Sequence, residues 1–378
     1  MTRYGILSLA AAVLLSSLGA TAAAADQPAD AAAPATASLT DMLTKSGIVA
    51  TGYISATYEN FSGVPTFREF DLDKNSFSLS QASLQVAYQP KDGFGGVVQL
   101  MAGDDASVIN KAEGSSASDF EVLQGYAQYA TGRWTLIGGK FLTLVGAEVI
   151  APTGNTNISR SLTFFTEPLT HTGFRATYAA SDQVTLILGV NNGWNVVHDN
   201  NTSKTLEIGA SLTPSKMWSF ALQGYVGKEP VSSTQDGTRS IVDFVGTWNA
   251  TDALTVILNY DWGRQENLPV DDSTATASGS WTTGALYVNY TFAPTWRVSL
   301  RAELLDDKDG FQTGTVQKVK EGTITLGWMP AKNFELRLEG RYDKSNQATF
   351  VKSVAVDSEE ATYRDNQSSV EVEGLFKF

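Results

Sequence analysis

The chain has 378 residues, and its 27 Lys and Arg against 40 Asp and Glu give a formal net charge of −13 at pH 7. This acidic balance argues against nucleic acid as a partner, because binding to phosphates needs a surplus of basic side chains. Cysteine is absent, which excludes thiolate metal sites and cysteine nucleophiles and agrees with passage through an oxidising compartment.

Residues 1–25 have the pattern of a secretory signal peptide. A basic residue precedes an apolar stretch from Ile6 to Leu18, and small residues from Ala20 to Ala25 offer cleavage sites. Residues 26–46 are rich in Ala, Pro, Thr and Asp, which predicts a flexible periplasmic leader. No later segment has the roughly 18 consecutive apolar residues that a membrane helix needs. We therefore expect residues 47–378 to form one folded domain.

From Ile48 onward, apolar and polar residues alternate with a period of two, which is the spacing of β-strands. The alternating segments are ten to thirteen residues long, about the length that crosses a bilayer at a tilt. Between residues 334 and 343, five apolar or small residues alternate with five charged ones. We count sixteen such segments, beginning near Ile48, Ser76, Gly93, Asp119, Arg133, Thr170, Gln183, Ser203, Met217, Thr238, Ala253, Ser280, Thr295, Lys318, Asn333 and Ser368.

Segments of this length favour a transmembrane antiparallel β-barrel over a soluble β-sandwich, whose strands are nearer about five or six residues. In lipid every backbone group must be paired, so the barrel closes, turns its apolar face outward and keeps its charged face inside. The expected fold class is therefore all-β, a barrel of about sixteen strands.

The connections between the segments alternate between short and long. Seven are tight turns rich in Pro, Gly, Asp and Asn, as expected at the periplasmic end, and eight are longer polar loops, as expected outside the cell. This count places both termini in the periplasm and the chain in the outer membrane of a Gram-negative cell. The loop carboxylates either share divalent cations with lipopolysaccharide or keep the loops soluble. They are Asp71, Asp73, Asp104, Asp105, Asp271, Asp272, Asp306, Asp307, Asp309, Glu359 and Glu360.

Aromatic residues mark the ends of the segments. The last strand ends in Phe378, which is similar to the signal that the bacterial barrel-assembly machinery reads. Other aromatic residues at segment ends predict either a girdle at the lipid–water interfaces or cross-strand packing pairs. Examples are Trp134, Tyr178, Trp218, Tyr260, Trp262, Trp296, Trp328 and Tyr342.

The segment from about residue 145 to residue 169 is the third predicted extracellular loop. A loop at this position resembles the third loop of sixteen-stranded porins, which folds into the barrel and narrows the pore. Glu148, Arg160 and Glu167 are its candidate constriction residues, because an arginine beside carboxylates sets a field across a pore. The alternative is that these charges pair with one another or face solvent. The apolar run Leu162 to Phe165 favours packing against the barrel.

Several stretches resemble the β-barrel porin family of proteobacteria of the OmpL-like porin-2 type. They are Asn157-Ile158-Ser159-Arg160-Ser161, Pro168, His171-Thr172-Gly173, Tyr178 and Gly189-Val190-Asn191-Asn192-Gly193-Trp194. The resemblance implies an outer-membrane barrel of about sixteen strands with a transport function, and it supplies no substrate. Asn195 follows the tryptophan where the family pattern has an acidic residue, so any role of that acid is lost or moved.

Polar residues of the strands are expected to face the lumen. They either stiffen the wall through cross-strand pairs or line a permeation path. The candidates are His171, Arg175, Arg297, Arg301, Glu303, Arg337, Glu339, Arg341, Glu371 and Glu373.

Three functions remain to be weighed. A barrel enzyme needs a general base beside a nucleophile, but the chain has only two histidines, His171 and His198, and neither has a serine placed beside it. A structural or adhesive barrel with a plugged lumen is the second alternative. Because a barrel of about sixteen strands leaves room for water, we predict a passive diffusion channel for ions and small hydrophilic solutes. It needs no enzyme activity, cofactor or metal, and it is expected to contact outer-membrane lipid, with a homotrimer as one open assembly.

Overall fold

The structure is a computed structural model that describes residues 45–232, 235–269, 276–354 and 360–378. The predicted signal peptide (residues 1–25) and nearly all of the predicted leader (residues 26–46) lie outside these residues, so this division of the chain stays a prediction. Among the helices of the described residues, none has the length and apolar character needed to cross a membrane.

Sixteen strands form one closed antiparallel barrel, which confirms the predicted fold class. Each strand begins within four residues of its expected start. The barrel strands are β1 (Ile48–Phe61), β2 (Ser76–Tyr88), β3 (Gly93–Ala102), β4 (Phe120–Thr131), β5 (Trp134–Leu142), β6 (Thr170–Ala179), β7 (Val184–Asn191), β8 (Thr205–Ser215), β9 (Trp218–Pro230), β10 (Asp236–Asn249), β11 (Leu254–Pro269), β12 (Thr276–Ala293), β13 (Trp296–Asp307), β14 (Gln317–Ala331), β15 (Phe334–Ser345) and β18 (Asn366–Lys377).

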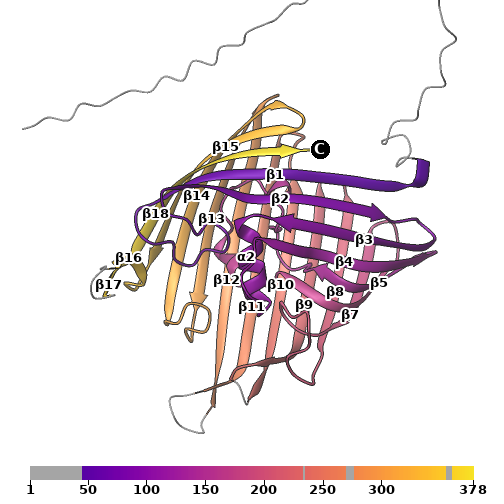
Figure 1. Ribbon diagram of the computed structural model, residues 1–378, viewed down its shortest axis with the longest axis horizontal. Helices are drawn as coiled ribbons and strands as arrows, with labels where there is room; N and C mark the ends of the chain where they lie inside the picture. Colours follow the sequence, from indigo (N-terminus) through magenta and orange to yellow (C-terminus); the bar gives the residue numbers. More distant parts are fainter. Residues whose placement is uncertain (1–44, 233–234, 270–275, 355–359) are drawn as a thin grey trace, which may run out of the picture.

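The last strand closes the ring against the first. Tyr53 of β1 lies opposite Lys377 of β18, and Figure 1 shows the yellow C-terminal strand beside the indigo first strand. The backbone of Phe378 continues this ladder, because its N–H and C=O each bond to Gly52 at 2.9 Å. A Cβ on Gly52 would meet the Phe378 ring at 2.4 Å, so the terminal aromatic ring lies directly over this glycine.

The strands reverse the polarity of a soluble protein, as the alternation predicts. Along β14, Glu321, Thr323 and Thr325 are buried in the interior, whereas Ile324 and Leu326 face outward. The outward face is apolar because it meets hydrocarbon, and the inward face carries the polar residues.

Aromatic pairs near the periplasmic turns satisfy both interpretations of the aromatic residues. Three examples join adjacent strands, and several of their rings are exposed on the outer surface. The pairs are Trp134 with Tyr178 (centroids 4.5 Å apart), Trp218 with Trp248 (5.6 Å) and Trp296 with Trp328 (6.1 Å). The same rings therefore pack across strands and lie where a lipid–water interface would be.

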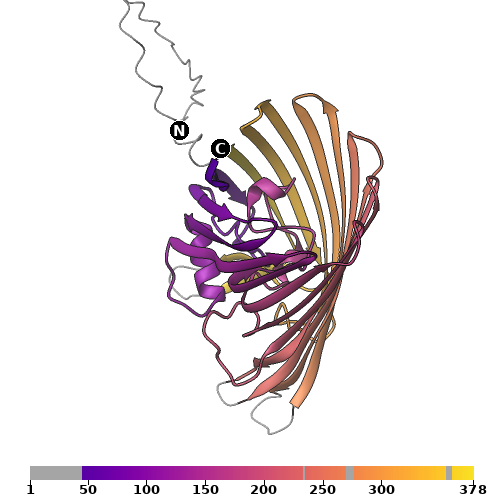
Figure 2. The same cartoon turned by 90° about the vertical axis from the view of Figure 1, so that its right-hand side faces the viewer.

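Two loops carry short helices into the barrel. The second loop (103–119) contains α2 (Asp104–Ala112), and the third loop (143–169) contains η1 (Pro152–Gly154) and α3 (Leu162–Phe165). Figure 2 shows the strands curving around these helical segments.

The helix α2 packs against the inner wall. Ala106 and Ile109 are fully buried and join a cluster with the wall residues Met101 and Leu123. The helix contacts β2, β3 and β4, beside which it lies in Figure 1.

The last loop contains a feature that the sequence analysis did not predict. Strands β16 (Phe350–Val354) and β17 (Ala361–Arg364) form a separate two-stranded sheet outside the barrel ring. Phe350 at its base is fully buried against residues of other loops.

Replacement of Leu338 by arginine tests the outward face of β15. Leu338 is half exposed near the middle of the strand, so Leu338→Arg is expected to destabilise the barrel by about 2–4 kcal/mol in lipid vesicles. Tyr342→Arg, two outward positions nearer the extracellular end, is the matched control with an expected cost of about 0–1 kcal/mol. Denaturant unfolding in vesicles measures both, and equal costs would contradict the placement of the membrane.

Candidate functional site

The third loop crosses the lumen. It leaves the wall at β5, and its middle reaches β13 to β15, which lie on the opposite side of the ring of sixteen strands. Ser159 N–H donates to Glu339 of β15 at 2.9 Å, and the side-chain amide of Asn157 donates to Thr325 of β14 at 2.6 Å. The loop therefore divides the interior instead of extending outward into solvent.

Four wall arginines hold the backbone of the third loop. An irregular segment buried in a barrel has peptide groups without secondary-structure partners, and each must be paired elsewhere. Each arginine donates to a different loop carbonyl: Arg337 to Pro152 (3.2 Å), Arg297 to Thr156 (2.7 Å), Arg301 to Ser159 (2.7 Å) and Arg341 to Arg160.

Wall carboxylates accept from the N–H groups of the same loop. Glu339 accepts from the backbone N–H of Ile158 at 2.6 Å and of Ser159 at 2.9 Å. Glu303 accepts from the backbone N–H of Thr163 at 3.2 Å. Arginines and glutamates of the wall therefore pair both kinds of backbone group in the loop.

The wall charges also pair with one another, which the sequence analysis left as one of two alternatives. Arg337 contacts Glu373 at 2.9 Å, and Arg341 contacts Asp343 at 2.8 Å. On the other side of the barrel, Arg175 contacts Glu207 at 2.9 Å. These pairs are buried in the interior, where charges are stable only when they have partners.

The three candidate constriction residues lie in three different settings. Glu148 is bonded to Arg301 at 2.8 Å, whereas Glu167 faces β10 and β11. Arg160 points across the first loop (62–75), with its guanidinium 5.4 Å from the centre of the Phe70 ring. The Arg160 guanidinium donates to three carbonyls of its own loop, those of Val149, Ile150 and Ile158.

A narrow gap remains between the third loop and the strands β1 and β2. Its volume is about 20 Å³, and Arg160 lines it together with Glu59, Asp71, Asp105 and Glu373. This volume holds about one water molecule.

The carboxylates of this gap differ in how they are neutralised. Asp71 pairs with Arg68 at 2.6 Å, and Glu373 pairs with Arg337. Within the described part of the chain, Asp105 takes part in no ion pair and accepts instead from the Gln81 amide at 2.6 Å. Burial raises the pKa of Asp105 to about 8.

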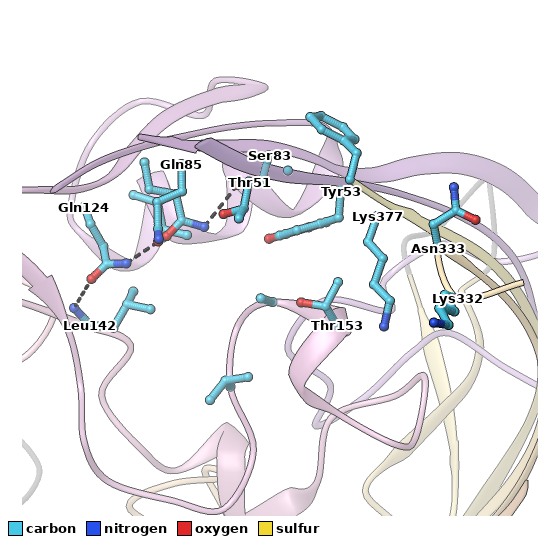
Figure 3. A pocket seen from close by; sticks show the side chains of 16 residues that line it. Thr51, Tyr53, Ser83, Gln85, Gln124, Leu142, Thr153, Lys332, Asn333 and Lys377 are labelled. Carbon is cyan, nitrogen blue, oxygen red and sulfur yellow. Dashed lines mark hydrogen bonds between the residues drawn. The ribbon is translucent and has the colours of Figure 1, made fainter. Parts of the chain in front are cut away.

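A larger cavity lies on the periplasmic side of the third loop. Its volume is about 590 Å³, and residues of the third loop, including Thr153, cover one end of it. Figure 3 shows Gln85, Gln124, Tyr53 and Lys377 around this space. Both spaces adjoin β1 and residues 151–153 of the third loop, so the gap lies next to this cavity, here called the periplasmic vestibule.

An apolar cluster covers the other face of the third loop. Val145 and Leu162 of this loop pack with the inward-facing wall residues Trp281, Leu305 and Val319 near the extracellular strand ends. Aromatic residues from four other loops complete the cluster: Phe67, Trp194, Phe311 and Phe350. The two sides of the lumen therefore differ. The polar gap lies beside β1 and β2, and the apolar cluster fills the opposite side.

Two of the gap carboxylates were not expected there. Asp71 and Asp105 belong to the acidic residues that the sequence analysis predicts in extracellular loops, but the structure buries both inside the barrel. The helical spacing of Ala106 and Ile109 puts both on the same face of α2 as Asp105. This spacing is a signal in the sequence that could have indicated a helix packed against the wall. Asp271, Asp272 and Glu359 of the same acidic group lie outside the described residues.

The histidines have no catalytic neighbours among the described residues. His171 bonds to the carbonyl of Gly193 through Nδ1 at 3.0 Å, and its ring stacks on Tyr225 at 4.4 Å. Its Nε2 has no hydrogen-bond partner there. His198 is exposed in the loop after β7. Neither histidine is hydrogen-bonded to a serine or a carboxylate in the described chain.

Asn195, which departs from the family pattern, closes the end of the third loop. Its side-chain oxygen accepts from the backbone N–H of Leu169 at 2.7 Å and of Thr170 at 3.1 Å. Its φ of 54° lies in the left-handed region, which asparagine tolerates well. A carboxylate could accept the same two bonds, so the amide keeps the contact without the charge.

A family model described as "Putative beta-barrel porin-2, OmpL-like" matches residues 43–378. No curated protein is significantly similar to the chain.

Solved outer-membrane barrels share the fold. The chain is similar to the outer-membrane channel DcaP of Acinetobacter baumannii, with a TM-score of 0.60 and 13% identity over 88% of this chain and 97% of that one. The comparison with OmpT of Vibrio cholerae gives a TM-score of 0.59 and 13% identity, and it covers 88% of this chain and 97% of that one. The comparison with an anion-selective porin from Comamonas acidovorans gives a TM-score of 0.59 and 11% identity, and it covers 88% of this chain and 99% of that one. At these identities the likeness concerns the fold.

Removal of the Glu339 carboxylate tests how the third loop is held. Glu339→Ala leaves the N–H groups of Ile158 and Ser159 without their acceptor, at about 1–3 kcal/mol for each buried donor. We expect faster amide hydrogen exchange in residues 143–169 of this variant. Glu371 lies directly opposite Glu339 on β18, and Glu371→Ala is the matched control because Glu371 contacts Arg68 and Ser369 and not the third loop. Unchanged exchange in Glu339→Ala would show that the loop does not depend on this carboxylate.

Proposed function

Because this chain belongs to the beta-barrel porin-2, OmpL-like family and is a porin-like channel that spans the outer membrane with its strands, we propose that it conducts ions and small hydrophilic solutes by passive diffusion. The observation that carries the proposal is the third loop, which crosses the lumen and leaves a polar gap next to the periplasmic vestibule. The solute gradient supplies the driving force, and the width and charge of the gap supply the selectivity.

We propose that the third loop is the constriction, with Arg160 as the residue of the original three that borders the path. Glu148 acts indirectly. It pairs with Arg301, and Arg301 donates a hydrogen bond to the Ser159 carbonyl of the third loop. Glu167 lies away from the gap. The wall arginines and glutamates position the loop, and Glu373 alone among the predicted lining residues borders the gap itself.

The charges of the gap favour cations at the alkaline pH at which all of its carboxylates are ionised. Arg160 contributes one positive charge, and two of the four carboxylates are paired with Arg68 and Arg337. Glu59 and Asp105 remain without an ion-pair partner in the described chain, and Glu59 accepts a backbone N–H at 3.0 Å. When Glu59 and Asp105 are both ionised, they outnumber the single charge of Arg160, and the gap then attracts cations and repels anions.

The proposed function needs no chemical step. The family and fold are typical of channels that are not enzymes, and the surroundings of His171 supply neither a nucleophile nor an orienting carboxylate. A non-conducting structural or adhesive barrel is the competing function, and the small volume of the gap is the observation that favours it.

The partners follow from the location. We propose that the exposed terminal ring of Phe378, on the outer surface of the closing strand, is read by the barrel-assembly machinery. Outer loops would contact lipopolysaccharide, and the apolar face would contact lipid. A homotrimer is the proposed assembly, since OmpT of Vibrio cholerae is described in a trimer form.

Conductance in a planar bilayer tests the channel directly. The refolded mature chain is expected to give stable single-channel steps, with a reversal potential that shows cation preference in a salt gradient at alkaline pH, where Asp105 is charged. Arg160→Ala removes the positive charge from the gap and should raise the cation-to-anion permeability ratio about fivefold, for about 1 kcal/mol of electrostatic energy in a partly solvated site. The exposed turn residue Arg133 is the control position, changed to Ala. A folded barrel that never conducts would favour the structural alternative.

The pH dependence of selectivity tests Asp105. Because its pKa is raised to about 8, the carboxyl is neutral near pH 6 and becomes charged toward pH 9. The cation preference should therefore increase over this range, by an amount on the order of twofold to fivefold. Asp105→Asn is expected to reduce this increase, while Asp182→Asn in a periplasmic turn leaves it unchanged. The same pH response in Asp105→Asn and the parent chain would contradict the role of this residue.

A further inference from the structure

Three buried carboxylates meet where the third loop ends against the wall. Asp243 of β10 and Asp261 of β11 lie directly opposite each other in the strand ladder and face inward. Glu167, near the end of the third loop, joins them. One oxygen from each of the three residues lies within 4.8 Å of the others. This cluster is separate from the gap beside β1 and β2, whose lining includes none of the three.

Among the described residues, no positively charged side chain pairs with the cluster. No ion pair of the described residues includes Glu167, Asp243 or Asp261, although arginines elsewhere in the wall pair with other carboxylates. Carboxylates in such a setting need either protons or a cation, because buried like charges repel strongly.

Several oxygens of this site are buried without a hydrogen-bond partner. Asn259 donates to one oxygen of Asp243 at 2.7 Å and to one of Asp261 at 3.1 Å. The other oxygen of each aspartate has no partner in the described chain, and the same holds for Oε1 of Glu167.

A neutral oxygen beside the carboxylates is also unpaired. Thr283 lies directly opposite Asp261 on the inward face of β12, and its side chain is almost fully buried. The Oγ1 atom of Thr283 has no hydrogen-bond partner among the described residues. Cross-strand neighbours of this kind have side chains within contact distance, so a hydroxyl oxygen lies beside the acidic cluster with nothing to bind.

We propose that Glu167, Asp243 and Asp261 form a binding site for one hard divalent cation, Ca²⁺. The donor set consists of oxygen atoms, without the nitrogen or sulfur ligands that transition metals prefer. Ca²⁺ accepts six to eight oxygens in flexible geometry, whereas Mg²⁺ requires a small, near-octahedral shell. Three carboxylates from a loop and two strands, with the Thr283 hydroxyl and water as further ligands, fit the larger ion.

The site would fasten both ends of the third loop to the wall. Gly146, near the start of the loop, has a φ of +92°, and a Cβ there would lie 2.1 Å from Oε2 of Glu167. Ala147 N–H donates to Asn259 at 2.7 Å, between the two aspartates. A cation held by Glu167, Asp243 and Asp261 would therefore connect the start and the end of the loop to β10 and β11. It would brace the loop that crosses the lumen.

Direct measurement of Ca²⁺ binding tests the proposal. The full mature chain is refolded in detergent without lipopolysaccharide, treated with a chelator, and titrated with CaCl₂ by calorimetry. One Ca²⁺ per barrel is expected. Asp243→Asn combined with Asp261→Asn should weaken binding at least tenfold. Asp182→Asn combined with Asp252→Asn removes the same charge from exposed periplasmic turns and should bind as the parent chain does.

Thermal unfolding provides a second readout that does not depend on conduction. Ca²⁺ is expected to raise the unfolding temperature of the parent chain and of the turn variant, but not of the Asp243→Asn/Asp261→Asn variant. If that variant does not fold, Glu167→Gln in the loop is tested in its place and should lose the Ca²⁺ response. Absent binding to the parent chain, or equal binding to parent and cluster variants, would overturn the proposal. A stability that changes with pH but not with Ca²⁺ would also overturn it, because protons would then fill the site.

Discussion

The interior of this barrel depends on one requirement, that a loop without regular secondary structure has its peptide groups paired inside a closed wall. Strands satisfy their own backbone, but residues 143–169 cannot, and water reaches little of the loop's middle. Arginines of the wall donate hydrogen bonds to the loop carbonyls, and glutamates of the wall accept hydrogen bonds from the loop N–H groups. The position of the third loop, the place of the gap and the burial of the apolar cluster all follow from this pairing.

The choice of arginine over lysine has a physical reason. A guanidinium has five N–H donors in a fixed plane, so it can hold a carboxylate and a carbonyl at once. Arg337 does this with Glu373 and Pro152, and Arg301 does it with Glu148 and Ser159. The carboxylates keep the guanidinium charge stable in the interior, and the free N–H groups then fix the loop. Charge pairing and loop anchoring are therefore one network.

The strands could be predicted from the sequence because their signal is local. A period of two and the composition of the turns decide where each strand runs, so the closed antiparallel barrel and its number of strands could be predicted. The path of the third loop could not, because its contacts join residues far apart in the chain, as Ile158 and Glu339 are, 181 positions from each other. Asp105 and Glu167 look like ordinary loop acids until the fold buries them. The approach of Glu167 to Asp243 and Asp261 likewise depends on where the loop ends.

The pairing of Tyr53 with Lys377 also governs how the protein reaches its final form. Until β18 has been made and inserted, β1 and β15 both present unpaired edges, and hydrocarbon offers no substitute for the missing bonds. Closure joins the first and last strands of the barrel, which are far apart in the sequence, and contacts between such distant residues make the intrinsic search slow. The barrel consequently cannot close in part. A chain that lacks β18 loses the pairing of this strand with both β1 and β15.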